Sequence, residues 1–378
     1  MKHLITLSQA VFVAVVLAMA AVSCSKHQEV VDSPSGGREL SFTARMVAAT
    51  KGTGDVSTSS LRTKGFGLFA WWENYGEYFE EVSPSRLWLE NSAMSYVSTE
   101  ADVDRWVCNP SAFWPLGNTK LSFFAYAPYL DCEGPELVFP YGDAGGMPKG
   151  LYSPSEDVSR QADLCLSVPV FDKGEDEGDI PMSFEHALTK VLFYFNVDGR
   201  QYEGDDYVYR VNRLELEGVV GSNVFTYSDS KPFIWNELPR SNTSIRTGSY
   251  DLHASSGTLI PGPVPFVSDV ELEDGLDRFE CVNGLAGGIL YLLPQPMTSL
   301  AKITVTMAGG HYVNDEWSES FVMDPVEIEL PTTTVWKAGE TVAYSGTIDI
   351  TRTIAVQLGV SIQAWDDETV DAGEFPVS

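Results

Sequence analysis

The stretch Leu40–Met46 (LSFTARM) alternates apolar and polar side chains along its whole length. Leu40, Phe42 and Met46 share one face with an alanine, whereas serine, threonine and arginine occupy the other face. The same period of two recurs along the chain, at residues 191–197, 302–307, 326–330 and 356–362. A period of two is that of a β-strand with one buried face, and such strands are typical of antiparallel sheets. The pattern predicts an all-β fold in which stacked sheets enclose each core.

The composition describes a folded, strongly acidic protein. The chain has 378 residues, and 24 basic against 53 acidic side chains give a formal net charge of −29. Such a charge repels nucleic-acid phosphates, so nucleic acid is excluded as a partner. Hydrophobic residues make up 44% and aromatic residues 12%, which is too apolar for a disordered acidic chain. With five histidines and no common catalytic or nucleotide-binding motif, the sequence predicts neither an enzyme nor a cofactor.

The amino-terminal residues have the pattern of an export signal. Lys2 precedes an unbroken apolar run over residues 10–22, which as a helix would rise roughly 20 Å. That is short of the roughly 30 Å hydrocarbon core and fits the apolar region of a signal peptide. Small residues directly before Cys24 are similar to a bacterial lipobox, which predicts cleavage before Cys24 and a lipid on its thiol. The alternative is ordinary cleavage beside an incidental cysteine.

The remaining chain divides by composition. Residues 1–23 are the predicted signal peptide, and the polar residues 24–37 are a predicted tether. The acidic, glycine-containing run at 172–179 (DKGEDEGD) is either a solvated linker or a cation site, and its spacing is not that of an EF-hand loop. We expect the linker, which gives one domain over residues 38–179 and a second over residues 180–378.

Four cysteines follow Cys24, at positions 108, 132, 165 and 281. None forms a CxxC pair and no histidine lies at ligand spacing, so we expect no metal site. In an exported protein they allow three disulfide pairings, or they are isolated buried thiols. His186 has no partner at catalytic spacing, which predicts a hydrogen-bonded structural histidine at the junction of the two domains.

An aromatic cluster follows the predicted second strand. Trp71, Trp72 and Tyr75 are interleaved with glutamates. Aromatic faces beside carboxylates are typical of sugar contacts, whereas packing in a β-sandwich core is the alternative. We expect packing, and we keep these three residues as a possible contact for a host glycan or protein.

Six short strings, taken in order behind the lipobox, resemble the fimbrillin (Mfa-like) family of Bacteroidales, lipoprotein precursors of outer-membrane fimbriae. The strings are 113–115 (FWP), 121–128 (LSFFAYAP), 182–190 (MSFEHALTK), 292–296 (LLPQP), 336–344 (WKAGETVAY) and 363–367 (QAWDD). The resemblance implies two β-sandwich domains of transthyretin-like topology. It also implies a lipid-anchored location at the outer membrane and the cell surface, within a fimbrium.

The resemblance further implies assembly by strand addition. In the family, an arginine-specific protease cuts after the first strand, and a strand from a neighbouring subunit fills the groove that is left. Here Leu40, Phe42 and Met46 are the predicted pocket fillers of the removable strand, and residues 351–364 are the predicted donor. Arg62, expected in a polar loop, is the favoured cleavage site. Lys51 and Arg45 are alternatives, and an anchor or accessory subunit that keeps its lipid would need no cut.

The sequence therefore predicts a structural, anchor or accessory subunit of outer-membrane fimbriae that supports adhesion. Its partners would be other fimbrial subunits, through strand addition, and the outer membrane, through the lipid. The alternative is a surface lipoprotein that binds glycans without polymerising.

Overall fold

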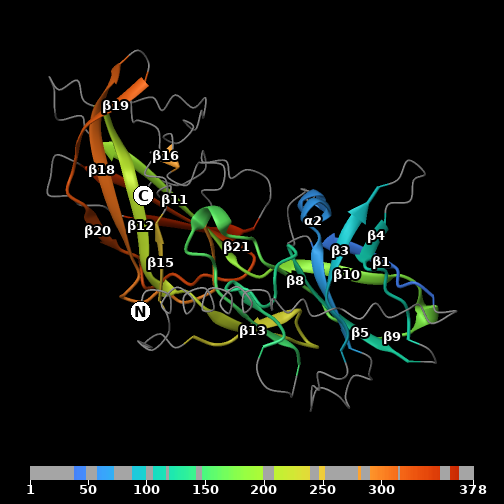
Figure 1. The fold of residues 1–378 in the computed structure, drawn as a ribbon. Coiled ribbons are helices and arrows are strands. Elements are labelled where there is room, and N and C mark those ends of the chain that lie inside the picture. The colour runs from blue at the N-terminus through green and yellow to red at the C-terminus, as the bar shows by residue number, and fades with distance from the viewer. Residues whose placement is uncertain are drawn as a thin grey trace, which may run out of the picture. The chain divides into compact units, whose positions relative to one another are not determined.

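The computed structural model describes residues 38–47, 58–71, 87–98, 105–115, 119–141, 147–198, 208–238, 247–251, 280–281, 290–313, 316–349 and 358–365. Residues 38–378 group as one compact unit. The predicted signal peptide and tether lie outside the described residues. The prediction of an all-β fold is confirmed: the described part consists of strands, one short α-helix, α2 (Thr58–Lys64), and two 3₁₀ turns (Figure 1). No helix among these residues has the length and apolar character needed to cross a membrane.

The first sheet closes on itself. Its strands, in spatial order, are β2 (Phe66–Trp71), β3 (Leu87–Val97), β4 (Arg105–Asn109), β1 (Phe42–Met46), β10 (Ile180–His186), β8 (Cys165–Ser167), β5 (Leu121–Ala127) and β9 (Val170–Lys173). Because β2 also pairs with β5, every strand except β9 belongs to a closed ring, which we call the closed sheet. Its interior is filled by an apolar cluster that includes Phe42, Phe66, Trp106, Phe123 and Phe184.

A second, four-stranded sheet packs on the outer face of the closed sheet. Its order is β14 (Phe233–Trp235), β13 (Asn223–Tyr227), β7 (Lys149–Tyr152) and β6 (Leu137–Val138). The core between them includes Phe124, Tyr126 and Phe225. Successive side chains of β5 point to opposite faces, so Phe123 faces the interior of the closed sheet and Phe124 faces this second core. Burial on both faces explains why β2 and β5 are apolar without alternation.

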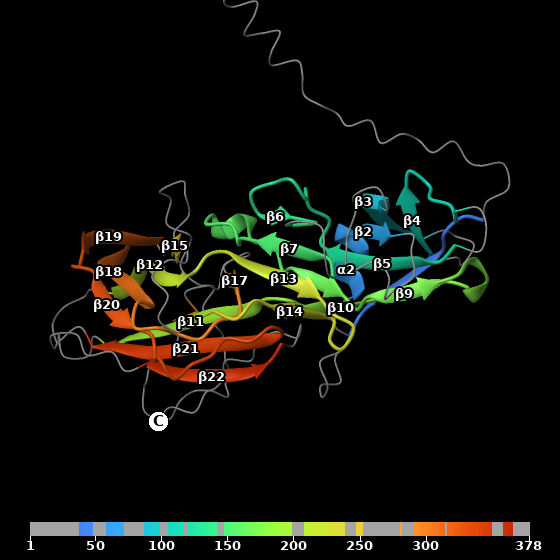
Figure 2. The ribbon, with the colours of Figure 1, turned by 90° about the horizontal axis from the view of Figure 1, so that it is seen from below.

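Two further sheets enclose the third core (Figure 2). One has the order β16 (Glu280–Cys281), β11 (Thr189–Asp198), β21 (Glu340–Asp349) and β22 (Leu358–Ala364), with β17 (Leu290–Leu292) also paired to β11. The other has the order β15 (Thr247–Asp251), β12 (Val208–Val220), β18 (Lys302–Val313) and β19 (Glu316–Val322), with β20 (Val326–Glu329) paired to β18. Phe193, Leu216, Ile303 and Tyr344 meet between them. The strands predicted from the period of two at 191–197, 302–307 and 326–330 are present as β11, β18 and β20.

Strand pairing crosses the predicted domain boundary at residue 180. The strand β10 lies after the boundary and pairs with β1, and β13 pairs with β7. The acidic run at 172–179 was expected to be a solvated linker between domains, but it is the short connection between β9 and β10 of one sheet. A 3₁₀ turn at Glu175–Glu177 compacts it, and the Gly174 N–H donates to the Glu177 carboxylate at 3.0 Å. The division into residues 38–179 and 180–378 stays a prediction.

Candidate functional site

The first strand, β1, occupies an internal position in the closed sheet, between β4 and β10. It runs parallel to β10, with Phe42 opposite Ile180 and Met46 opposite Phe184. On this side the Ile180 N–H donates to the Ser41 carbonyl at 2.8 Å. On the other side Phe42 pairs with Trp106 of β4. A strand of only five residues thus has ladder partners on both edges.

Hydrogen bonds extend the attachment to the residues just before β1. The Leu40 N–H donates to the Ala112 carbonyl and the Trp114 N–H donates to the Arg38 carbonyl, both at 2.9 Å. The Arg38 guanidinium also donates to the Glu175 carbonyl at 3.1 Å. The whole segment 38–47 is therefore held as a continuous ribbon.

The side chains of β1 show the alternation that the sequence predicts. Leu40 is 5% exposed and Phe42 is 3% exposed, whereas Thr43 and Arg45 face solvent. Met46 is half-buried against the same core. Leu40, Phe42 and Met46, the predicted pocket fillers, thus all point into the interior of the closed sheet.

Removing β1 would open the closed sheet at one place. The facing edges of β4 and β10 would lose their ladder partners. Behind them lie Trp106 and Phe184, whose rings both pack on Phe66, at centroid distances of 4.9 and 5.2 Å. The result would be a slot with unpaired backbone on both sides and an aromatic floor, which is the surface that an added strand recognises.

The three candidate cleavage residues differ in their surroundings. Arg62 was expected in a polar loop, but it lies in α2 with its guanidinium 4.4 Å from the centre of the Tyr96 ring. The helix packs its buried Leu61 into the core of the closed sheet. Arg45 lies within β1, and its Nε donates to the Ser183 hydroxyl at 3.4 Å. Lys51 lies outside the described residues.

The last described strand, β22, lies at an edge of its sheet. Among the described strands it pairs with β21 alone, from Glu340 opposite Ala364 to Gly346 opposite Leu358. Val360 is 37% exposed and Ile362 is 48% exposed. An edge strand with free ladder groups and exposed apolar side chains is a template for pairing with another chain. This strand is the described part of segment 351–364, whose role as a donor stays a prediction.

Trp365, directly after β22, fastens the end of that strand. Its side chain is buried, and its ring stacks between His186, at 4.2 Å, and Tyr291, at 5.5 Å. The backbone N–H of Trp365 donates to the Gly339 carbonyl at 2.8 Å. The stack on His186 joins the end of β22 to the end of β10.

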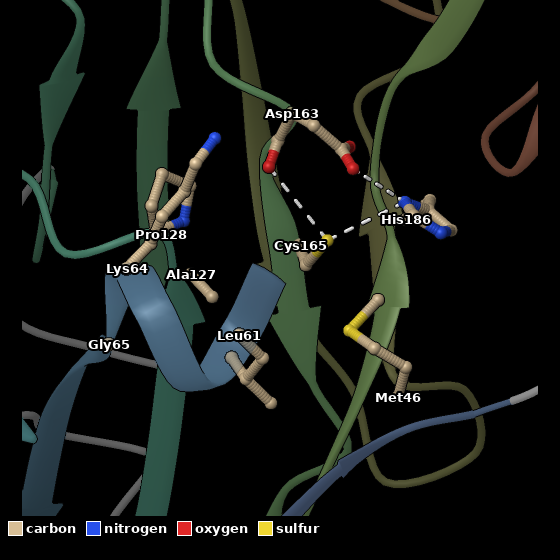
Figure 3. Close-up of a pocket in the computed structure, with 9 residues that line it drawn as sticks. All are labelled: Met46, Leu61, Lys64, Gly65, Ala127, Pro128, Asp163, Cys165 and His186. Carbon is tan, nitrogen blue, oxygen red and sulfur yellow. Dashed lines mark hydrogen bonds and ion pairs between the residues drawn. The ribbon is translucent and has the colours of Figure 1, made fainter. Parts of the chain in front are cut away.

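Asp163, Cys165 and His186 form a polar cluster at the end of the closed sheet (Figure 3). The His186 Nδ1 lies 2.9 Å from the Asp163 carboxylate and 3.6 Å from the Cys165 sulfur. The predicted hydrogen-bonded His186 is thereby confirmed. In a nucleophile–base–acid triad the acid and the nucleophile contact different ring nitrogens. Here both contact Nδ1, so the cluster cannot relay a proton from the thiol to the carboxylate.

The cluster was missed at the level of sequence because its members are not close in the chain. Cys165 and His186 are brought together by register, as directly opposite residues of β8 and β10. Asp163 stands two residues before Cys165 and shares its side of the extended chain. Only knowledge of this strand pairing would have pointed to the cluster.

The cysteines whose state the structure describes are free thiols: Cys108, Cys132 and Cys165. Burial raises the pKa of the Cys108 thiol to about 11 and that of the Cys132 thiol to about 12. Both are therefore neutral at physiological pH. Cys24 lies outside the described residues, so its lipidation stays a prediction.

Among the predicted ligand-contact residues, Trp71 is buried in the core under the four-stranded sheet. Its ring packs on those of Phe69 and Phe124, at centroid distances of 6.0 and 5.2 Å. This placement agrees with packing as the role of Trp71. Trp72 and Tyr75 lie outside the described residues.

Comparison with known proteins relates the chain to proteins of bacterial fimbriae. A family model described as fimbrillin-like matches residues 58–365. The chain is 28% identical over 191 residues to the fimbrium subunit Fim1C of Phocaeicola vulgatus, an alignment that covers 47% of this chain and 48% of that protein. The chain thus spans about half the length of this curated relative.

The fold is also similar to that of a solved structure. A crystal structure of a fimbrial protein from Bacteroides vulgatus ATCC 8482 aligns with a TM-score of 0.60 and 18% identity. The alignment covers 87% of this chain and 100% of the other.

Proposed function

The chain belongs to the fimbrillin-like family, and we propose that it is a structural, anchor or accessory subunit of a fimbrium, supports adhesion, and assembles by exchanging its first strand. The observation that carries the proposal is the position of β1. It is an internal strand of the closed sheet, yet it is the first strand of the described chain and is followed next by α2. It can therefore leave without breaking any other strand connection.

The acceptor half of the exchange is the slot between β4 and β10. A strand that enters it would gain backbone hydrogen bonds on both edges, as β1 does with Ala112 and Ile180. Burying a side chain of the size of Phe42 contributes about 1.5–3 kcal/mol, and Leu40 contributes a similar amount. Two such pockets and the ladder give the slot a strong preference for an alternating apolar strand.

The donor half of the exchange is the carboxyl-terminal segment that contains β22. Val360 and Ile362 stand on one face of the strand at a spacing of two, and both are exposed. At the first strand, Leu40 and Phe42 have the same spacing and are buried. The exposed pair of β22 thus matches in spacing, with smaller side chains, the pair that the slot of a neighbouring subunit would bury.

Maturation would convert the precursor into the acceptor. We favour cleavage after Arg62, with Lys51 and Arg45 as alternatives and no cleavage in an anchor subunit. Arg62 lies in a helix, whereas cleavage by proteases concentrates in exposed, poorly ordered segments, so cleavage there requires α2 to unwind.

We further propose that Cys24 carries the lipid that anchors the precursor at the outer membrane. The family resemblance also supports a transthyretin-like topology with two β-sandwich domains, which we propose for this chain.

The N-terminus of the polymerised subunit tests this proposal. Fimbriae are purified and the first residue of the subunit is identified by mass spectrometry. We expect chains that start after β1, at Thr63 if Arg62 is the site. Polymers in which every subunit retains residues 40–46 would contradict strand exchange.

The donor is tested by the double substitution Val360→Asp with Ile362→Asp. Both side chains are exposed, so the subunit should still fold, but a buried charge in the neighbour's slot should prevent polymerisation. Leu300→Asp is the matched control, because Leu300 is 52% exposed and lies outside β22. Polymerisation by the double variant at the rate of the control would assign the donor to another segment.

A further inference from the structure

We propose that Asp163, Cys165 and His186 form a binding site for a divalent cation of the zinc class. The three residues offer a carboxylate, a thiolate and an imidazole, which are the donors that Zn²⁺ takes in proteins. Their ligand atoms all lie within 4.8 Å of one another. The ligands come from β8, β10 and the residues before β8, so none of them is lost if β1 leaves, although Met46 of β1 lines the adjoining pocket.

The register of two strands creates the site. Cys165 and His186 are directly opposite in the antiparallel pair of β8 and β10. Opposite residues of an antiparallel pair project to the same face, with Cβ atoms about 4.5–5.5 Å apart. The extended chain places Asp163, two residues before Cys165, on that same face. Figure 3 shows the three side chains converging on one point.

The distances suit a tetrahedral ion. Zinc bonds of about 2.3 Å to sulfur and about 2.0–2.1 Å to nitrogen place these two atoms about 3.5 Å apart at the tetrahedral angle. The Cys165 sulfur and the His186 Nδ1 are 3.6 Å apart. The Asp163 Oδ2 lies 2.9 Å from Nδ1, at hydrogen-bond distance, and must retreat by about 0.5 Å to become a ligand. Rotation of a side chain that is 24% exposed allows this movement.

The charges also balance. The thiolate and the carboxylate together neutralise a divalent ion, and the imidazole binds in its neutral form with its proton on Nε2. On binding, the Cys165 thiol releases its proton to solvent. A neutral His186 that carries its proton on Nδ1 exchanges it for one on Nε2, and a doubly protonated ring releases the Nδ1 proton to solvent. The sulfur lies 3.8 Å from the backbone carbonyl of Asp163, so its weak hydrogen bond there is easily exchanged for a metal bond.

Two features prepare the site for an ion. The Oδ1 atom of Asp163 is buried and accepts no hydrogen bond in the described structure. A buried carboxylate oxygen without a donor is unfavourable, and a cation beside it would remove that cost. In addition, the stack of His186 on Trp365, at 4.2 Å and 8° between the rings, restricts the orientation of the imidazole.

The surroundings leave room for a fourth ligand and a route of entry. A pocket lined by Met46, Leu61 and Pro128, among others, adjoins the three ligands (Figure 3). Three protein ligands with one open position, filled by water, are the usual arrangement of an accessible zinc site. We place a water in the fourth position.

Cobalt provides the optical probe. The purified protein is stripped with a chelator and titrated with Co²⁺, and Zn²⁺ is then added in competition. We expect one equivalent of Co²⁺ with a thiolate-to-metal charge-transfer band that Zn²⁺ abolishes. The band should be absent in Cys165→Ser and retained in Cys108→Ser, a free thiol outside the cluster. Absence of the band in the parent protein, or its persistence in Cys165→Ser, would overturn the proposal.

Asp163→Asn keeps the test valid if Cys165→Ser does not fold. Asn has the shape of Asp, and Asp163 is partly exposed, so the unfolding temperature without metal should stay close to that of the parent. We expect Zn²⁺ to raise the unfolding temperature of the parent and to bind Asp163→Asn at least tenfold more weakly. Equal Zn²⁺ affinity of the two proteins would show that the cluster is only a hydrogen-bonded structural feature.

Discussion

The ring of Phe42 meets the ring of Phe123 edge to face inside the closed sheet, with centroids 5.8 Å apart. Phe42 belongs to the strand that we propose is exchanged, and Phe123 belongs to β5, on another part of the ring. The contact therefore links the first strand directly to the core of the closed sheet. It sets the size of side chain that a donor strand must bring to this position.

Truncation of Phe42 should strongly destabilise the precursor. Phe42→Ala removes a buried aromatic ring and leaves a cavity, which typically costs about 3–5 kcal/mol. Thr43→Ala, on the exposed face of the same strand, should change the free energy of unfolding by less than about 0.5 kcal/mol. Urea denaturation followed by tryptophan fluorescence compares the two. Equal stabilities would mean that β1 contributes no core packing.

The end of α2 depends on a glycine. Gly65 has φ +68°, and its N–H donates to the Leu61 carbonyl at 2.9 Å, as in a helix C-cap. In Gly65→Ala the new Cβ would collide with the backbone carbonyl of Met94. We expect a loss of more than about 2 kcal/mol, from left-handed strain of about 1 kcal/mol plus the clash.

Gly339→Ala separates those two causes, because Gly339 has φ +71° and the nearest atom to a new Cβ is the His186 carbonyl oxygen at 3.9 Å, an ordinary contact. This variant should lose only the strain, about 1 kcal/mol. Thermal or urea unfolding of both variants measures the difference. If Gly339→Ala is as unstable as Gly65→Ala, the close approach of Gly65 to the Met94 carbonyl of β3 is not what constrains Gly65.

Trp365 should control the release of the donor strand. Trp365→Ala removes the ring stacked between His186 and Tyr291, so the end of β22 loses its anchor. We expect faster hydrogen exchange in peptides from residues 358–364, while β11 stays protected. Gln363→Ala, an exposed change in the same strand, is the control and should leave the exchange rates unchanged. Unchanged exchange in Trp365→Ala would show that pairing with β21 alone holds the strand.

High pH should weaken the fold through Cys108. Burial raises the pKa of this thiol from 9.0 to about 11, with a hydrogen bond to Ser92 opposing the shift. The pKa of the thiol is higher in the folded state than in the unfolded state. The free energy of unfolding therefore keeps its full value below pH 9 and falls as the pH rises from 9 towards 11. The loss is at most about 1.4 kcal/mol per pH unit in that window.

The pH prediction is checked by urea unfolding at pH 8 and at pH 10. Cys108→Ala lacks the titrating group and should lose less stability between these two values than the parent does. Buried tyrosines and Cys132 titrate in both proteins, so the comparison isolates Cys108. The same loss in both proteins would mean that the thiol has an ordinary pKa in the folded state.

Sequence patterns predicted the strands that bury one face. In Leu40–Met46 and in residues 302–307 of β18 the alternation follows the burial of each residue closely. The run Leu121–Ala127 has no alternation because both of its faces are covered, so the sequence could not show which residues face which core. Arg62 was misplaced because a helix of seven residues is too short to produce a helical period.

Long-range pairing was beyond the reach of the sequence patterns. The parallel pair of β1 and β10 joins residues that are far apart, and neither strand carries a local signal for the other. The same holds for β7 with β13, and for Cys165 with His186, which meet only through the register of β8 and β10. The charged run before β10 resembled a domain linker because its side chains are solvated, although its flanking strands share one sheet.

Rescue of a truncated subunit by a peptide tests strand exchange most directly. A chain that begins at residue 48 lacks β1, and its molar mass is measured by light scattering with and without a peptide of residues 38–47. We predict oligomers or aggregates without the peptide and a stable monomer with it, whereas the same peptide with Phe42→Asp should not rescue. A truncated chain that stays monomeric with an unchanged unfolding temperature, and that binds neither peptide, would contradict the account.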